Sequence, residues 1–230
     1  MGLEQCEHEL MVLMAAFNEE EGIGLTIKEL RKVLGDCRIL VVDGNSSDNT
    51  AGVAKSLGAE VVYQKGQGKG DAVACGLRRM PDGYEYVVLI DADYTYPAEY
   101  IPRMVKILQS NSRVGMICGN RFNSLMHFNV MNDYLYFGNR TIAFIHNFLN
   151  GVELKDPLTG LRLVRSELLK KWYPKSEGFD VEVELNHHVE RQGYGIREID
   201  ILYRRRVGKK KLSALDGVAI MKRILIEVLY

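Results

Sequence analysis

The chain has 230 residues, 47% of them apolar, which is enough for one sizeable hydrophobic core. Its thirty basic and thirty acidic residues cancel, so no overall positive charge points to nucleic acid as a partner. The four cysteines are widely spaced and the histidines form no HExxH pattern, which argues against a disulfide framework and against structural zinc.

The first half of the chain alternates apolar runs with segments of helical periodicity. Strands are predicted over residues 10–15, 38–43, 59–63, 86–91 and 114–119. Helices are predicted over residues 26–34, 51–57 and 71–79, and a further helix is expected to start at Pro97. Two short strands, 161–164 and 196–202, follow with a helix over 181–191 between them. This order predicts an α/β protein with a mostly parallel sheet and helices on both faces.

Polar side chains follow several of these strands. Asp43 ends the second strand, Lys69 lies in a glycine-rich loop over 66–70, and Asp91 and Asp93 end the fourth strand. The carboxyl ends of parallel strands meet at one edge of a sheet, where ligands bind. Two carboxylates this close repel each other unless a cation lies between them, and oxygen ligands suit Mg²⁺ or Mn²⁺. The sequence therefore predicts a divalent metal site at Asp91 and Asp93.

The glycine-rich loop fits neither of the two familiar phosphate-binding patterns. Lys69 is followed by Gly70 rather than Ser or Thr, which excludes a Walker A loop. The loop also follows the third predicted strand, whereas a dinucleotide fingerprint follows the first. Lys69 still suits contact with an anion.

Two later segments allow two interpretations each. Residues 122–150 are rich in aromatic side chains and form either a buried helical hairpin or amphipathic helices at a membrane surface. Residues 204–211 hold six cations in eight positions and form either a solvated tail or a site for anions or phospholipid surfaces. No window reaches the ~18 consecutive apolar residues that cross a bilayer. We expect a domain over 1–212 and an amphipathic helix over 213–230, which could begin a longer extension.

Four motifs occur in order after successive strands: Ala15-Ala16-Phe17-Asn18-Glu19-Glu20, the stretch 41–50, Gly68-Lys69-Gly70 and Asp91-Ala92-Asp93. Together they closely resemble the family-2 glycosyltransferases with the GT-A fold, and specifically the polyprenyl-phosphate (dolichyl-phosphate mannose synthase-like) branch. The resemblance continues through Gly119-Asn120-Arg121, the stretch 156–162 and the basic segment 203–212. It implies a Rossmann-like GT-A sheet with a C-terminal amphipathic and basic extension, and the variations within its motifs point to an archaeal subgroup.

The resemblance implies a role for each group of residues. It implies that the nucleotide contacts Ala15, Phe17, Glu19, Asp43, Lys69 and Asp91. It implies that Mg²⁺ or Mn²⁺ is held by Asp91 and Asp93, with Thr95 where the family often has Gln or Ser. It implies that the acceptor phosphate is gripped by Arg121, Arg140, Arg206 and Lys211. The catalytic set is expected to be Asp93, Arg121, Arg140 and Asp156, while Glu182 and Glu184 either bind sugar hydroxyls with Asp156 or are cap or surface carboxylates.

The implied activity is metal-dependent, inverting transfer of a sugar from a nucleotide-sugar to a polyprenyl (dolichyl) phosphate. The donor would be GDP-mannose, a UDP-hexose or a UDP-N-acetylhexosamine, and the enzyme would act peripherally on the cytoplasmic membrane face. A phosphate acceptor is already anionic, so little or no general base is needed.

Two alternatives remain at this point. A GT-A transferase with a soluble or glycan acceptor would need a base such as Asp156 or Glu182 near the anomeric carbon. A sugar nucleotidyltransferase normally has a basic glycine-rich loop after its first strand, which residues 15–20 lack.

Overall fold

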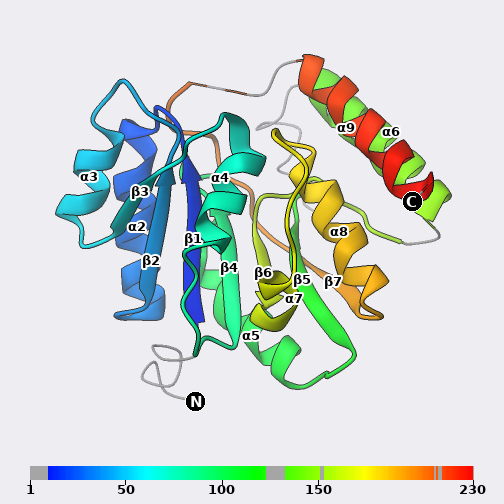
Figure 1. Ribbon diagram of the computed structural model, residues 1–230, viewed down its shortest axis with the longest axis horizontal. Helices are drawn as coiled ribbons and strands as arrows, with labels where there is room; N and C mark the ends of the chain where they lie inside the picture. The colour runs from blue at the N-terminus through cyan, green and yellow to red at the C-terminus, as the bar shows by residue number, and fades with distance from the viewer. Residues whose placement is uncertain (1–9, 123–132, 151–152, 210, 212–213, 230) are drawn as a thin grey trace.

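A seven-stranded mixed sheet forms the centre of the molecule (Figure 1). The computed structural model describes residues 10–122, 133–150, 153–209, 211 and 214–229. The strands are β1 Leu10–Ala16, β2 Arg38–Asp43, β3 Glu60–Tyr63, β4 Tyr86–Asp91, β5 Val114–Asn120, β6 Arg162–Arg165 and β7 Gly195–Asp200. Their order is β3-β2-β1-β4-β6-β5-β7, and β6 alone runs antiparallel to its neighbours β4 and β5. The predicted mostly parallel α/β sheet is confirmed.

The helices lie close to the predicted segments. They are α2 Glu20–Leu34, α3 Thr50–Ser56, α4 Gly68–Leu77, the 3₁₀ turn η2 Ala98–Tyr100, α5 Ile101–Gln109, α6 Asp133–Asn150, α7 Ser166–Lys170, α8 Val181–Arg191 and α9 Ala214–Leu229. Two predicted starts were wrong. Helix α2 begins at Glu20, where acidic residues favour a helix N-terminus, and α4 begins at Gly68, so the glycine-rich segment is largely its first turn.

The sheet is covered on both faces. On one face, α2 and α5 pack on Val12, Ile39 and Val88, and on the other α4, α7 and α8 pack on Met11, Leu40 and Val87 (Figure 1). Successive strand residues therefore alternate between two buried layers, which explains why these strands are apolar throughout. Cys37, Cys75 and Cys118 are buried within these layers.

Helices α6 and α9 lie side by side next to α8 (Figure 1). Ile220 and Ile224 of α9 pack with Val183 of α8 and with Ile142 and Ile145 of α6. The helix expected over 213–230 is thus α9, and α6 covers the second part of the aromatic segment 122–150; residues 123–132 lie outside the described residues. Within the described ranges, no helix combines the length and apolar character needed to cross a membrane.

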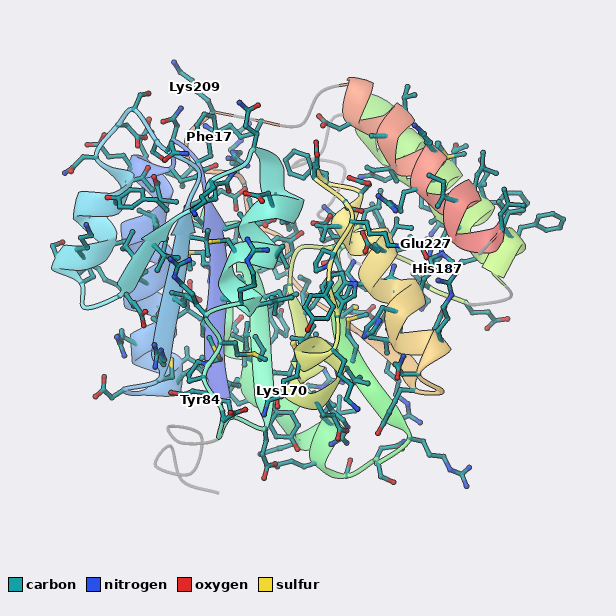
Figure 2. All side chains as sticks on the ribbon, viewed as in Figure 1. Phe17, Tyr84, Lys170, His187, Lys209 and Glu227 are labelled. Atoms are coloured by element: carbon teal, nitrogen blue, oxygen red, sulfur yellow. The ribbon has the colours of Figure 1, made fainter. Side chains whose placement is uncertain are left out.

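After β7 the chain returns across the carboxyl ends of the strands. We call residues 203–209 and Lys211 the basic strap. Its backbone N–H groups at Arg204 and Val207 donate to the carbonyls of Thr95 (2.9 Å) and Asp93 (3.1 Å). Figure 2 shows Lys209 at the same end of the molecule as Phe17, with Tyr84 and Lys170 at the opposite end. The strap thereby brings its cations to the predicted ligand edge.

Candidate active site

The acid pair lies at the carboxyl end of β4, and a separate cation contacts each carboxylate. Lys69 Nζ lies 2.5 Å from Asp91 Oδ1, and Arg206 Nη1 lies 2.5 Å from Asp93 Oδ2. Arg206 also pairs with Glu19 through its other terminal nitrogen. The structure therefore joins the ends of β1 and β4 to the basic strap in one charged cluster.

The backbone of the acid pair is held in an uncommon conformation. Tyr94 has φ +65°, in the left-handed region that a bulky side chain rarely adopts. Its N–H donates to Thr26 Oγ1 at 3.1 Å, and the Arg204 guanidinium lies 4.5 Å from its ring centroid. Arg204 is anchored in turn by two bonds to Glu29, of 2.5 and 2.8 Å. Contacts from α2 and from the strap thus hold the turn that aims the two carboxylates.

Thr95, the predicted third metal ligand, is fully buried and contacts Asp93. Its hydroxyl donates to Asp93 Oδ1 at 2.6 Å and its N–H donates to the same oxygen at 3.1 Å. These bonds fix the orientation of the Asp93 carboxylate.

The pKa values of the three acids in this cluster shift in different directions. Burial and the neighbouring Asp91 charge raise the pKa of Asp93, although Arg206 opposes them. Burial likewise raises the pKa of Glu19 to about 7 despite the contact with Arg206. At Asp91, by contrast, Lys69 outweighs burial and lowers the pKa.

The chemistry of these residues fits a divalent cation. Asp91 and Asp93 supply hard oxygen ligands, the Asp91 side chain is 29% exposed, and Glu19 Oε2 is buried without a hydrogen-bond partner. Across the described residues, no group of three or more acidic, histidine or cysteine side chains is arranged to hold a metal. A cation at Asp91 and Asp93 would therefore take further ligands from the bound substrate.

Lys69 bridges two acids in the first turn of α4. Its Nζ lies 2.6 Å from Glu182 Oε1 as well as 2.5 Å from Asp91, and its side chain is only 16% exposed. Burial lowers the pKa of Lys69, but the Asp91 and Glu182 carboxylates outweigh burial and raise it above its usual range. Lys69 is thus a permanent cation at the sheet edge, and Glu182 Oε2 is buried with no partner of its own.

The predicted nucleoside residues line the ends of β1 and β2. Ala15 is half-buried in β1, and the Phe17 ring is 50% exposed at this edge. Asp43 is buried and accepts bonds from the Ser46 N–H (2.9 Å) and hydroxyl (2.6 Å), so it holds the turn after β2. Glu19, by contrast, is directed to Arg206 and the acid pair.

Arg121 and Asp156 form a buried, two-pronged ion pair. Arg121 Nε and Nη2 donate to the two Asp156 oxygens at 2.6 and 2.7 Å, and the Arg121 N–H donates at 3.0 Å. The Arg121 guanidinium also lies 5.4 Å from the Tyr203 ring centroid. Both Asp156 oxygens are therefore already occupied by Arg121, which leaves this carboxylate poorly placed to act as a general base.

The two remaining predicted phosphate ligands, Lys211 and Arg140, lie in different places. Lys211 reaches the edge and donates to the Asn18 carbonyl at 2.9 Å. Arg140 is exposed on α6, and no ion pair in the described part of the chain links it to the acid pair.

Sequence reasoning missed a close approach that shapes the site. Gly160 lies so near Asp91 that a Cβ there would overlap the carboxylate, and its N–H donates to the Tyr96 hydroxyl at 2.7 Å. The motif 156–162 contained this glycine, but only the antiparallel pairing of β6 beside β4 brings it to Asp91.

Comparison with known proteins identifies the family. The profile described as "Glycosyl transferase family 2" matches residues 11–173, which include the acid pair, Lys69 and Arg121. The chain belongs to glycosyl transferase family 2.

Among curated family-2 relatives, a "Dolichyl-phosphate hexose transferase" of Haloferax volcanii is 33% identical over 96% of this chain and 93% of its own length. An "Undecaprenyl-phosphate mannosyltransferase" of Micrococcus luteus is 24% identical over 89% of this chain and 87% of its own. The chain is therefore a glycosyltransferase, and the expected resemblance to polyprenyl-phosphate transferases and to archaeal relatives is confirmed. Membership of this family also removes the nucleotidyltransferase alternative.

Solved structures confirm the GT-A-like fold of this family-2 enzyme. Glucosyl-3-phosphoglycerate synthase of Mycobacterium tuberculosis, in complex with Mn²⁺, UDP-glucose and phosphoglyceric acid, has a TM-score of 0.76 at 21% identity. It covers 99% of this chain, which covers 84% of that protein.

Proposed function

We propose that this enzyme transfers a hexose from a nucleotide-sugar to a polyprenyl phosphate. The observation that carries the proposal is the basic strap: Arg206 and Lys211 come from the far end of the sequence to Asp93 and Asn18. A cationic segment beside the acid pair suits an acceptor that carries a phosphate. The whole-length similarity to a dolichyl-phosphate hexose transferase supports the same acceptor class.

The donor would bind at the ends of β1, β2 and β4. We assign the nucleoside to Ala15, Phe17 and Asp43, and its diphosphate to Lys69 and to Mg²⁺ or Mn²⁺ on Asp91 and Asp93. When bound, the cation neutralises charge that develops on the departing nucleoside diphosphate. We assign the unpartnered Glu182 Oε2 to accept a hydrogen bond from a sugar hydroxyl.

The acceptor oxygen would attack the anomeric carbon in line with the leaving diphosphate, with inversion. A phosphate monoester needs no deprotonation at neutral pH, so positioning and electrostatic stabilisation supply the catalysis. The contacts of Asp156 favour this route over a soluble or glycan acceptor, because both of its carboxylate oxygens accept hydrogen bonds from Arg121. Arg121, Arg206 and Lys211 would orient the acceptor phosphate through their positive charges, which attract phosphate oxygens.

The outer faces of α6 and α9 would rest on the membrane. Phe144 and Phe148 of α6 are 70% and 78% exposed, and Leu225 and Leu229 of α9 are 51% and 77% exposed. Lys222 is exposed on the same helix. Exposed apolar side chains beside cations suit the interface of an anionic bilayer, so we propose peripheral association with the cytoplasmic membrane face, with Arg140 on α6 near the lipid phosphates.

Product analysis tests the proposal directly. The protein is incubated with a short polyprenyl phosphate, Mg²⁺ or Mn²⁺, and radiolabelled GDP-mannose, UDP-hexoses or UDP-N-acetylhexosamines, and lipid is then extracted. We expect label in the organic phase with one donor, and none when the acceptor or the metal is omitted. Label transferred only to soluble acceptors, with an active membrane preparation as positive control, would refute the lipid acceptor.

A further inference from the structure

Glu184 lies in the first turn of α8, buried and facing the loop between α7 and α8, residues 171–180. Its two carboxylate oxygens accept the backbone N–H groups of Lys175 (2.8 Å) and Ser176 (2.7 Å). The side chain is therefore fully used within the protein, in contrast to Glu182 two residues before it. Of the two glutamates, Glu184 is the one whose carboxylate oxygens both bind the backbone of this loop.

The segment that Glu184 holds rests directly on the first turn of α4. The Glu177 carbonyl accepts the Gly70 N–H at 2.8 Å. A Cβ at Gly70 would overlap the Ser176 carbonyl oxygen, and a Cβ at Gly68 would overlap that of Glu177. Gly68 also has φ +81°, where a side chain would be strained. Both glycines thus allow a close contact between two backbones.

Lys69 lies between these two glycines, so the same backbone contact fixes the position of its main chain. Its Nζ is placed between Asp91 and Glu182, and the Phe179 ring from the same loop lies 5.8 Å from it. The C-terminal end of the loop is also held in place. Asp180 accepts the Gly178 N–H at 3.2 Å and forms an ion pair with Arg223 of α9 at 3.1 Å. Displacing residues 175–178 would therefore release the turn that carries Lys69.

We propose that Glu184 is a positioning residue for the donor diphosphate, acting through residues 175–178 and the Gly68–Gly70 turn on Lys69. This inference rests on the proposed nucleotide-sugar donor. A fixed Lys69 binds the diphosphate without the entropic cost of ordering a long side chain, so loss of Glu184 weakens donor binding and leaves acceptor binding intact.

Trp172 makes the test independent of turnover. It is the chain's single tryptophan, it lies at the start of this loop, and it is buried against His188. Intrinsic fluorescence is titrated with UDP and with GDP in the presence of Mg²⁺ for wild type, Glu184→Gln and Glu190→Gln. Gln keeps the shape of Glu184 but replaces one acceptor oxygen with an NH₂ donor, which faces a backbone N–H and loses one hydrogen bond. Glu190→Gln makes the same change elsewhere on α8 and is the matched control.

We expect Glu184→Gln to weaken nucleotide affinity and to raise the donor KM by about tenfold, with the acceptor KM unchanged, whereas Glu190→Gln matches wild type. Trypsin should also cleave faster after Lys175 in Glu184→Gln. In a Lys69→Met background, Glu184→Gln should produce no further loss of nucleotide affinity, because the two residues act in one chain of contacts.

The outcomes separate the two proposals. A wild-type protein that binds neither nucleotide and transfers no sugar would refute the donor assignment. A wild type that binds, together with a folded Glu184→Gln of equal affinity, would overturn the positioning role. If Glu184→Gln does not fold, Gly70→Ala perturbs the same contact from α4 and should show the same loss, and equal affinity in that variant overturns the inference too.

Discussion

At the scale of single residues, the ion pairs of the candidate active site join four acids to two cations. Asp91 and Glu182 share Lys69, while Asp93 and Glu19 share Arg206. Burial removes solvent from the carboxylates, and this, together with the neighbouring acids, raises the pKa values of Asp93 and Glu19. A divalent cation at Asp91 and Asp93 would offset part of this negative charge.

Removing one acid of the pair tests the metal assignment. Asp93→Asn should lower the rate of sugar transfer on the order of a thousandfold, because a metal ion supplies several kcal/mol of transition-state stabilisation. Asp82→Asn is the control, since Asp82 is exposed and pairs with Lys170 at the opposite end of the sheet. Initial rates at saturating Mn²⁺ are compared, and comparable rates for the two variants would contradict the assignment.

Comparing variants of Arg205 and Arg206 tests whether the acceptor phosphate needs a specific contact or only positive charge. Arg206 contacts Asp93 and Glu19, whereas Arg205 is exposed with no ion pair among the described residues. Arg206→Ala should raise the polyprenyl-phosphate KM by roughly tenfold or more, because hydrogen bonds to charged groups contribute about 1.5–3 kcal/mol each. Arg205→Ala should leave that KM close to wild type. Equal effects of the two changes would mean that only net charge matters.

At the scale of elements, the packing of α6 against α8 buries two histidines. His146 and His187 meet edge to face with ring centroids 5.4 Å apart, and both are almost completely buried. Burial lowers the pKa of each to about 4, assisted by Arg162 at His146 and by His146 and Arg191 at His187. The neighbouring positive groups make protonation of this interface costly.

This histidine pair predicts a loss of stability in acid. The folded pKa values of about 4 lie below the usual 6.5, so the unfolded chain binds more protons as pH falls between them. Stability should be complete above about pH 6.5 and fall by a few kcal/mol toward pH 4. Urea unfolding across this range measures it. A His146→Phe/His187→Phe variant should show a shallower decline, and an unchanged slope would contradict the assignment.

The exposed face of α6 predicts lipid binding at the same scale. Phe144 and Phe148 stack with centroids 6.3 Å apart on the outer side of this helix. Replacing both by Ser should reduce flotation with anionic phospholipid vesicles by about tenfold or more, because burying one aromatic side chain is worth about 1.5–3 kcal/mol. Tyr173→Ser removes a side chain that is 77% exposed outside α6 and α9, and should float normally. Unchanged flotation of the Phe variant would exclude this face.

At the scale of the whole molecule, the basic strap near the C-terminus returns to the end of the first strand, at the candidate active site. Glu19 and Arg206 are 187 residues apart in sequence yet form an ion pair. The strap is held by Arg204 on Glu29 and by backbone bonds to the acid-pair turn, so the sheet edge and the C-terminal segment form one unit. Helix α9 is joined to the same unit through Arg223 and Asp180. The proposed donor site, the proposed acceptor site and α9 are thus linked by ion pairs and hydrogen bonds.

By itself, the sequence determined the strand–helix alternation and the gathering of Asp43, Lys69 and the acid pair at one edge. These follow from local periodicity and from the rule that parallel strands end together. Only the tertiary structure decided that β6 pairs antiparallel with β4, that Asp156 forms an ion pair with Arg121, and that Glu19 forms one with Arg206. It also showed that Glu184 serves a backbone loop while Glu182 faces Lys69. Ion pairs between residues distant in sequence depend on how whole elements pack. A local sequence pattern therefore does not predict which partner a buried charged side chain contacts.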